Sequence, residues 1–411
     1  MTETKSYCIS KTLVKQAYER VKSNHGTYGV DRQGIESFEK NLKKNLYRIW
    51  NRMSSGSYFP PAVREVSIPK VNGGERKLGI PTVGDRVAQM VAKLYLEPEI
   101  EPIFHTDSYG YRPGKSAINA VEKARQRCWQ FNWVIDLDIK GFFDNINHEK
   151  LMTALEKHCT LEWIKLYVKR WLKAGTQTQQ GIEQKEKGTP QGGVISPLLA
   201  NLFLHYAFDK WMNMKYSDNP FERYADDIII HCRTEQEAQQ VLQSIKERLA
   251  VCGLEVNEEK TKVVYCKDMI RKEEHPQHSF TFLGYEFRPR FSRSMKGHFY
   301  VGFLPAISKT AKKKITTGMR RWKLHTWTQY TVKEIANYIN PVLRGWINYY
   351  GHYQKSELYK VFSLLDYRLV KWYVKKYKGI GKKRAVRWWK KLKENSNTLF
   401  AHWQLSYTKI K

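Results

Sequence analysis

The chain has 411 residues, 41% of them hydrophobic, which is enough for two or three domains with cores of their own. Its formal net charge of +31 makes nucleic acid the expected partner, because so basic a protein needs a polyanion to offset its charge. No apolar run approaches the ~18 residues of a membrane span, and no signal sequence is evident. The six cysteines form no Cys-x-x-Cys pair, so we expect a cytoplasmic protein with reduced thiols and no membrane partner.

The positive charge is concentrated toward the C-terminus. Residues 305–411 contain 25 Lys and Arg against 4 Asp and Glu, a net charge of +21. The preceding 304 residues carry 46 Lys and Arg against 36 Asp and Glu, a net charge of +10. A solvated lysine-rich face would explain isolated runs of basic residues, but not the difference in net charge between the two parts of the chain. We therefore expect the last quarter of the chain to bind a polyanion.

The first part of the chain is predicted to be mostly helical. Apolar residues at helical spacing predict helices within residues 1–60, on either side of a loop at 26–31. Asn72-Gly73-Gly74 then predicts a β-hairpin between 64–70 and 76–81. Further helices are expected at 86–100, 117–128, 148–159 and 161–172, with an aromatic turn at 108–113 and a strand beginning at Trp133.

Capping signals mark the elements that follow. A glycine-rich loop at 188–197 opens a long helix from 198 to about 215, with Ser196 as the expected N-cap residue. Thr234 and Glu237 form a capping box for another helix, which should end just before Gly253. Strands are expected at 254–262, 280–285 and 297–303. From residue 305 the pattern is helical, with a second capping box at 331–334.

Two clusters of aspartate interrupt apolar strands. Asp226 and Asp227 precede Ile228-Ile229-Ile230, so a tight turn would place both carboxylates at the tip of a hairpin. Asp136 and Asp138 share one face of the strand that begins at Trp133. Carboxylates this close repel each other unless a cation lies between them, and hard divalent ions prefer oxygen ligands. The pattern is typical of two-metal phosphoryl transfer.

Seven stretches occur in an order that chance explains poorly. They are residues 68–81, 108–113, 138–144, 188–193, 224–227, 282–285 and 345–350. In this order they resemble a reverse transcriptase, and most closely the reverse transcriptase/maturase proteins of bacterial group II introns, in the form that lacks the HNH endonuclease domain. The resemblance extends from about residue 24 to about residue 378.

The resemblance implies an α+β right-hand polymerase. Fingers and a palm with an antiparallel sheet would occupy 1–304, including an N-terminal extension at 1–60. A helical thumb, which doubles as the maturase domain, would occupy 305–378, and a basic nucleic-acid-binding tail would follow at 379–411. The loop at 26–31 is similar to a template-contacting loop of the family, although a purely structural helix–loop–helix is an equal alternative.

The implied activity is RNA-directed DNA synthesis with two Mg²⁺ ions. Asp138, Asp226 and Asp227 would be the catalytic metal ligands, and Ile139 belongs to the same metal site. The family places the acid five residues before an aromatic, which selects Asp138 over its rival Asp136. That aromatic, Phe143, would exclude the 2′-hydroxyl and disfavour RNA synthesis. The alternative is that Phe143 belongs to the core.

The resemblance assigns further residues to nucleotide and strand binding. Nucleotide-binding roles fall to Lys70, Arg76, Phe143, Gln191, Lys260 and Lys262. Either Lys260 or Lys262 would protonate the departing pyrophosphate, and the sequence does not separate them. Template and primer contacts fall to Arg112, Gly192, Tyr224, Leu283 and Gly284. Four cations of the basic tail are expected to bind nucleic acid: Lys382, Lys383, Arg384 and Arg387. The tryptophans interleaved with the basic residues, Trp372, Trp388 and Trp389, are expected to stack on bases.

The implied partners are an RNA template, group II intron RNA, a DNA primer or target and deoxynucleoside triphosphates, in the bacterial cytoplasm. The implied roles are splicing and retrohoming of the intron. Two alternatives stay open. A maturase could act solely as an RNA-binding splicing factor. The presence of all three expected metal ligands, Asp138, Asp226 and Asp227, which we call the acidic triad, argues instead for polymerase activity. A domesticated relative could work in repair or phage defence.

Overall fold

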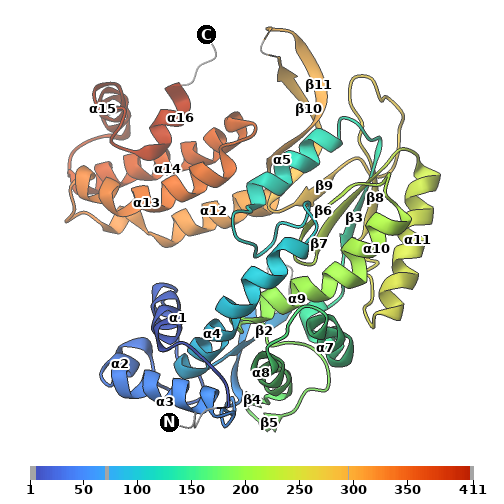
Figure 1. Ribbon diagram of the computed structural model, residues 1–411. Helices are drawn as coiled ribbons and strands as arrows, with labels where there is room; N and C mark the ends of the chain where they lie inside the picture. The colour runs from blue at the N-terminus through green and yellow to red at the C-terminus, as the bar shows by residue number, and fades with distance from the viewer. Residues whose placement is uncertain (1–5, 70–73, 295, 408–411) are drawn as a thin grey trace. The chain divides into compact units, whose positions relative to one another are not determined.

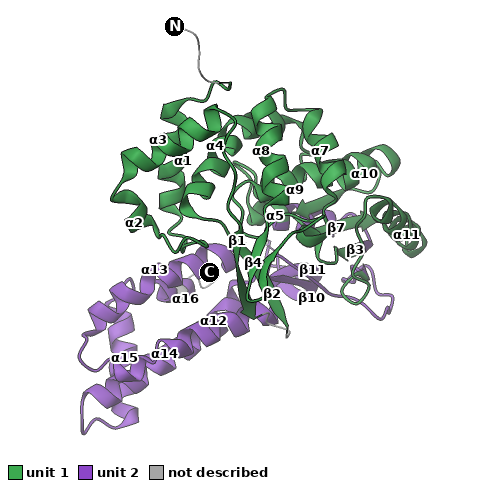
Figure 2. Ribbon diagram, turned by 90° about the horizontal axis from the view of Figure 1, so that it is seen from below, with its two compact units in different colours: residues 1–120, 135–262 green, residues 121–134, 263–411 purple. Residues whose placement is uncertain are grey.

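The computed structural model describes residues 6–69, 74–294 and 296–407. It has two compact units (Figure 2): unit 1 comprises residues 1–120 and 135–262, and unit 2 comprises residues 121–134 and 263–411. Helices and short sheets alternate in unit 1, and most of unit 2 is a three-stranded sheet followed by helices. Within the described ranges, no helix is long and apolar enough to cross a membrane.

Unit 1 begins with helices that pack on one buried helix (Figure 1). α1 (Lys11–Ser23), α2 (Ile35–Glu39) and α3 (Leu42–Ser54) precede a hairpin of β1 (Val63–Pro69) and β2 (Glu75–Ile80). The next helix, α4 (Val83–Ile100), begins where the Thr82 hydroxyl accepts a hydrogen bond from the Asp85 amide, and most of its residues are buried. α1 and α3 pack against α4.

The next part of the chain, up to residue 265, contains both helices and short strands. They are η1 (Glu101–Ile103), α5 (Ala117–Arg127), β3 (Trp133–Asp138), α6 (Phe142–Asn145), α7 (His148–Glu156), α8 (Glu162–Lys173), β4 (Thr176–Thr178), β5 (Gly181–Glu183), α9 (Ser196–Leu204), η2 (His205–Asp209), α10 (Lys210–Lys215), β6 (Phe221–Tyr224), β7 (Asp227–Cys232), α11 (Glu235–Val251) and β8 (Lys262–Tyr265).

Two four-stranded sheets bring distant segments together. One has the order β2-β1-β4-β5, in which β1 and β4 run parallel and the other pairs are antiparallel. The other has the order β6-β7-β3-β8, and its β6–β7 pair is an antiparallel hairpin. The isoleucines of β7 are fully buried, as their β-branched run predicts. The aspartates of β3 and of the β6–β7 hairpin therefore lie on neighbouring strands.

Unit 2 continues with β9 (Phe280–Phe282), β10 (Tyr285–Arg293) and β11 (Phe299–Ile307), in the order β11-β10-β9. Its helical elements are α12 (Lys309–Arg321), η3 (Leu324–Thr326), α13 (Val332–Tyr350), α14 (Lys355–Lys376), α15 (Lys382–Asn395), η4 (Ala401–Trp403) and α16 (Gln404–Tyr407). Trp389, Phe400 and Trp403 pack into the same hydrophobic core as residues of α12, α13 and α14. The structure thus has no break in packing at residue 378, where the sequence suggested that a separate tail begins.

The local signals of the sequence are mostly reproduced. Both capping boxes form, at Thr234 and at Thr331, and Gly253 follows α11 with a φ of +81°. Ser196 is a correction, because it is the first helical residue and Ile195 occupies the N-cap position without a side-chain cap. The Ser196 hydroxyl is instead hydrogen-bonded to the Thr189 hydroxyl at 2.9 Å. The long helix predicted to follow is interrupted by the π-helical segment η2.

Candidate active site

The second aspartate cluster forms a two-residue turn between β6 and β7. Tyr224 pairs with Asp227, which leaves Ala225 and Asp226 at the tip. Ala225 has a φ of +57°, a left-handed conformation that non-glycine residues rarely adopt. We call residues 224–227 the acidic turn. As the sequence predicts, it carries Asp226 and Asp227 at the end of a hairpin.

Main-chain hydrogen bonds connect Arg223, the residue before the acidic turn, to the segment that precedes α5. The Tyr109 amide donates to the Arg223 carbonyl at 2.8 Å, and the Arg223 amide donates to the Asp107 carbonyl at 2.9 Å. A Cβ atom at Gly110 would lie 2.5 Å from the Ala225 nitrogen. Only glycine therefore fits at position 110 without displacing the acidic turn.

Asp138 ends β3 and is held by the segment before β8, which contains a turn at 258–260 in place of most of the strand expected at 254–262. Its amide donates to the Thr261 hydroxyl at 3.2 Å, and its carbonyl accepts from the Asn257 amide at 2.8 Å. Its carboxylate forms an ion pair with Lys260 Nζ at 3.1 Å. Ile139 is buried and pairs with Val256, so its main-chain carbonyl is the group that it could offer to a metal ion.

The charges of this region are coupled. Burial raises the pKa of Asp226 and the nearby Asp138 carboxylate adds to the rise, while Arg76 and Lys260 oppose it. Burial also raises the pKa of Asp136, to about 7, with Lys262 opposing the rise. The Lys260 charge, paired with Asp138, therefore acts on the acids expected to bind metal, whereas the Lys262 charge acts on Asp136. A carboxyl that is often protonated at neutral pH is the poorer metal ligand.

The donor set suits a hard divalent cation, since it consists of carboxylate oxygens. Among the residues that the structure describes, no three His, Cys, Asp or Glu side chains already converge as a metal site. The Lys260 ammonium instead neutralises Asp138. An ion at Asp138 would therefore have to displace Lys260 from this carboxylate.

Two residues expected to bind nucleotide, Arg76 and Gln191, are brought together. Arg76 Nε donates to the Gln191 side-chain oxygen at 2.7 Å, and the Gln191 amide group donates to Asp144 at 3.3 Å. The main-chain carbonyl of Gln191 accepts a hydrogen bond from the Gly79 amide at 2.9 Å. This chain of contacts joins the β1–β2 hairpin to the glycine-rich loop. Lys70, the other cation expected on the hairpin, lies outside the described residues.

The glycine-rich loop is positioned by the buried helix α4. Asp85 accepts hydrogen bonds from Tyr58, Trp171 and Gln89, and the Gln89 oxygen accepts from the Val194 amide at 2.7 Å. Gly192 has a φ of +129°, and a Cβ atom there would lie 2.7 Å from the Gly79 carbonyl oxygen. This glycine therefore permits close approach to the hairpin backbone, and its expected contact with template or primer stays a prediction.

Phe143 lies at the start of α6 beside Phe142, with ring centroids 5.2 Å apart. Both rings are buried, Phe142 at 2% and Phe143 at 7% exposure. The Phe143 carbonyl accepts from the Thr189 amide at 2.8 Å. The ring thus packs beside Phe142 while the main chain of Phe143 is bonded to the glycine-rich loop, and the gating role expected of Phe143 stays a prediction.

Arg112 and Tyr111 have different environments. The Arg112 guanidinium pairs with Glu101 at 2.7 Å and donates to the His105 and Ser108 carbonyls, and its side chain is 7% exposed. It therefore holds the turn and has little surface left for a template. Tyr111 is half exposed, its ring centroid is 6.2 Å from that of Tyr224, and burial together with Asp226 raises its pKa. No sequence signal separates these two neighbours, since both fit an aromatic turn.

The turn between β9 and β10 of unit 2 contains Leu283 and Gly284. Both have left-handed φ values, +49° and +81°, as a type I′ hairpin turn requires. The Tyr349 hydroxyl donates to the Leu283 carbonyl at 2.8 Å, and a Cβ atom at Gly284 would lie 3.1 Å from the Tyr350 hydroxyl. α13 therefore fixes the turn expected to contact the primer.

The four expected cations of the C-terminal region, Lys382, Lys383, Arg384 and Arg387, are exposed on α15. The tryptophans interleaved with them are placed differently from the expectation that they stack on bases. Trp372 and Trp389 are buried in the core, and Trp388 stacks on Tyr373 at 3.6 Å. The cations therefore form the exposed face of a helix whose aromatic residues serve packing.

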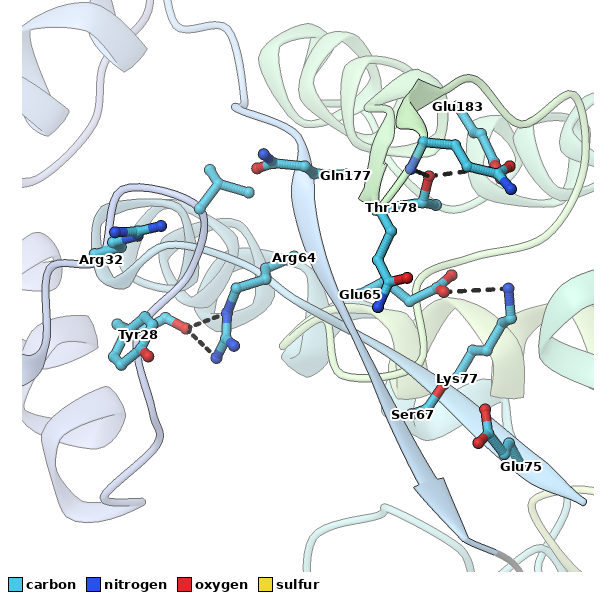
Figure 3. A pocket seen from close by; sticks show the side chains of 13 residues that line it. Tyr28, Arg32, Arg64, Glu65, Ser67, Glu75, Lys77, Gln177, Thr178 and Glu183 are labelled. Atoms are coloured by element: carbon cyan, nitrogen blue, oxygen red, sulfur yellow. Dashed lines mark hydrogen bonds and ion pairs between the residues drawn. The ribbon is translucent and has the colours of Figure 1, made fainter.

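A polar pocket of about 750 Å³ lies in unit 1 beside the β1–β2 hairpin (Figure 3). Tyr28 contributes from the loop at 26–31, and Arg64 lies 4.5 Å from the Tyr28 ring centroid while donating to the Tyr28 carbonyl at 2.8 Å. Lys77 pairs with Glu65 at 3.1 Å on the hairpin side, and Gln177 and Thr178 face the pocket from β4. The lining is thus rich in hydrogen-bonding groups around one half-exposed aromatic ring.

Comparisons with known proteins identify two families that this chain matches. The family model for reverse transcriptase (RNA-dependent DNA polymerase) matches residues 68–287, and the model for the group II intron maturase-specific domain matches residues 312–393. The group II intron-encoded protein LtrA of Lactococcus lactis subsp. cremoris is 27% identical over 91% of this chain and 74% of its own length. Protein YkfC of Escherichia coli is 35% identical over 46% of this chain and 51% of its own length.

Among solved structures, telomerase from Candida albicans with a fragment of telomeric RNA aligns with a TM-score of 0.45 and 13% identity, over 91% of this chain and 68% of that one. The reverse transcriptase match covers more than half of the chain and includes every member of the acidic triad. It confirms the α+β polymerase fold and the enzyme class expected from the sequence. The chain belongs to the reverse transcriptases, the RNA-dependent DNA polymerases, and carries a group II intron maturase-specific domain.

Proposed function

We propose that this polymerase extends a primer with deoxynucleoside triphosphates by means of two Mg²⁺ ions held by Asp138, Asp226 and Asp227. The observation that carries the proposal is that these acids lie on neighbouring strands, where burial raises the pKa of Asp226 and the charge of Asp138 adds to the rise. Bound Mg²⁺ would lower the pKa of the primer hydroxyl and stabilise the leaving pyrophosphate. Asp136 is less suited to this role because burial favours its neutral form.

The cations around the acids bind the triphosphate and supply a proton. Arg76 and Gln191 contact each other and present donors at the hairpin and the glycine-rich loop. Lys260 exchanges its contact with Asp138 for the pyrophosphate and donates a proton to it, while Lys262 remains beside Asp136. The geometry favours Lys260 over Lys262 for this step.

Aromatic residues of the site contact the incoming nucleotide and the template strand. Phe143 excludes a 2′-hydroxyl from the incoming nucleotide, and Tyr111 takes the template contact for which Arg112 has no donors to spare. The pocket beside Tyr28 and Arg64 accepts the single-stranded RNA template before it is copied (Figure 3). A half-exposed ring flanked by a cation and amide side chains suits an unpaired nucleotide.

The second partner is group II intron RNA, whose splicing the chain assists. The maturase-specific match at 312–393 and the net charge of +21 over residues 305–411 support this role. Retrohoming, with DNA as primer and target, then requires both activities in one chain.

The test is primer extension on an RNA template across a Mg²⁺ titration. Asp227→Ala should abolish extension while binding of the primer–template survives. Asp218→Ala removes an exposed aspartate from the loop before β6 and serves as the matched control. Wild-type extension by a variant that lacks Asp138, Asp226 and Asp227 together would refute the metal site.

A further inference from the structure

The strands β10 and β11 of unit 2 form a long hairpin (Figure 1). The aromatic residues on one of its faces are buried at one end and exposed at the other. Its register pairs Phe287 with Pro305 and Arg293 with Phe299, so residues 285, 287, 289, 291 and 293 share one face with their partners on β11. β9 pairs with residues 285–287 of β10, so it covers the edge of β10 at the base of the hairpin, the end opposite its turn. On this face Phe287 and Phe303 are buried at the base.

The far end of the same face exposes two aromatic rings. Phe291 is 67% exposed and Phe299 is 61% exposed. Their centroids lie 5.1 Å apart with an angle of 14° between the planes, which is a stacked arrangement. Together they present a continuous apolar surface to solvent, and exposed phenylalanines that are held in this way need an explanation beyond core packing.

The surrounding charge indicates what could cover the rings. Residues 285–307 contain four Lys and Arg and a single acid, Glu286. Glu286 pairs with Arg288 and Arg290 at 3.0 Å each, toward the base. At the far end, the Arg293 guanidinium lies 5.5 Å from the Phe299 centroid, and Lys296 is exposed. A purely apolar partner would leave these cations without compensation, whereas a nucleic-acid strand offers both bases and phosphates.

We propose that Phe291 and Phe299 form a stacking platform for unpaired bases of RNA, with Arg293 and Lys296 neutralising the adjacent phosphates. Every base has a π-face, so such a platform binds single strands with little sequence preference. The site uses no residue of the acidic triad and goes beyond the polymerase reaction. It gives unit 2 a second kind of contact, to looped or single-stranded RNA, besides the phosphate contacts of α15.

The structural alternative is a cross-strand pair that merely stabilises the hairpin. Two double variants of the full chain separate the alternatives. Phe291→Ala with Phe299→Ala removes rings and apolar contact together, whereas Phe291→Leu with Phe299→Leu keeps the apolar cross-strand contact but removes the π-faces. Tyr47→Ala is the matched control, because Tyr47 is 58% exposed and packs on the Trp50 ring at 5.6 Å.

The measurement is the affinity for a fluorescent, unstructured 12-nucleotide RNA that contains one 4-thiouridine, followed by photocrosslinking and peptide mapping. Both double variants should bind about tenfold more weakly and lose a crosslink that maps to residues 288–304 in wild type. Tyr47→Ala should bind like wild type, and extension of a short primer–template should be unchanged in every variant.

The Leu variant decides the question if the Ala variant does not fold. Wild-type RNA affinity in a folded Leu variant would overturn the proposal in favour of the structural pair. Unchanged RNA binding with altered self-association in sedimentation would overturn it in favour of protein docking. A loss confined to single-stranded DNA of the same sequence would likewise overturn the assignment to RNA.

Discussion

Arg223 and Asp209 form a fully buried, two-point ion pair beneath the acidic turn. Arg223 Nε and Nη2 donate to the two Asp209 oxygens at 2.6 and 2.5 Å, and neither side chain is exposed. Arg223 Nη1 also donates to Asn201 at 2.9 Å and to the Ala225 carbonyl at 3.2 Å. The guanidinium thus joins η2 and α9 to the residue whose left-handed conformation shapes the turn.

This pair gives the first prediction. Arg223→Met leaves the Asp209 carboxylate buried and unpaired, which should lower the free energy of unfolding by about 3–5 kcal/mol. Adding Asp209→Leu should recover most of that stability, because the buried charge is then gone. Extension should stay low in the double variant, since the bond to Ala225 is still missing. Recovery of wild-type extension along with stability would show that Arg223 is structural and does not position the acids.

Gly110 gives a second prediction, for a position that contacts the same turn. Gly110→Ala places a Cβ atom 2.5 Å from the Ala225 nitrogen, so the acidic turn must shift. Extension should fall more than tenfold, because small displacements of reacting groups are costly. Gly34→Ala is the control, since a Cβ atom there meets nothing within 4 Å. Equal activity of the two variants in a primer-extension assay would contradict the proposed packing.

Sequence patterns anticipated what is encoded locally. The acidic turn and both capping boxes follow from spacing and residue type. The placement of Trp389 in the core was missed, because a tryptophan in a basic run suits either a core or a base-stacking surface. The Arg223–Asp209 pair was missed as well, since nothing in spacing reveals that η2 approaches β6. Such contacts depend on tertiary packing.

The third prediction concerns sugar selection by Phe143, whose ring packs beside Phe142 and whose carbonyl is bonded to the glycine-rich loop. Phe143→Val should raise ribonucleotide incorporation relative to deoxynucleotide, because the smaller side chain leaves room for a 2′-hydroxyl. Competition between the two nucleotides in single-turnover extension measures the ratio. Phe142→Val controls for loss of core packing. The same ratio in wild type and Phe143→Val would assign Phe143 to the core.

The fourth prediction concerns Asp366, which ties the C-terminal segment to α14. Burial alone would raise its pKa, but His402 at 2.8 Å, Trp403 at 2.9 Å and Lys393 at 3.6 Å lower it overall. A carboxyl group whose pKa is lowered by folding stabilises the folded state at pH values above its ordinary pKa of 3.8. This stabilisation is lost as the pH falls through the lowered pKa. Asp366→Asn should therefore cost about 1–3 kcal/mol at pH 7.

The stability difference between Asp366→Asn and wild type should shrink as the pH falls below 4. Urea unfolding followed by tryptophan fluorescence at several pH values measures it, because Trp403 lies at the ion pair. Glu394→Gln, at an exposed position of α15, is the control for loss of a charge. A difference that does not change with pH would mean that packing, and not the carboxylate charge, holds the segment.

The last prediction concerns the exposed cations of α15. Lys382, Lys383, Arg384 and Arg387 face solvent while Ala385 and Trp389 bury the opposite side of the helix. Lys393 is left out of the test because it pairs with Asp366. Each phosphate contact contributes roughly 0.7 to 0.9 to the slope of log affinity against log salt. Replacing the four residues by alanine should thus flatten that slope by about two to three units for a long folded RNA.

A charge-matched variant separates local contact from the loss of net charge. Alanine at Lys15, Lys43, Lys44 and Arg48, all exposed on α1 and α3, removes the same charge from unit 1. Extension on a saturating short primer–template should fall much less than RNA binding, because the α15 cations include no member of the acidic triad. A salt titration of binding compares the three proteins. If both quadruple variants flatten the slope equally, the α15 cations act through net charge alone; if neither does, they are a solvated face.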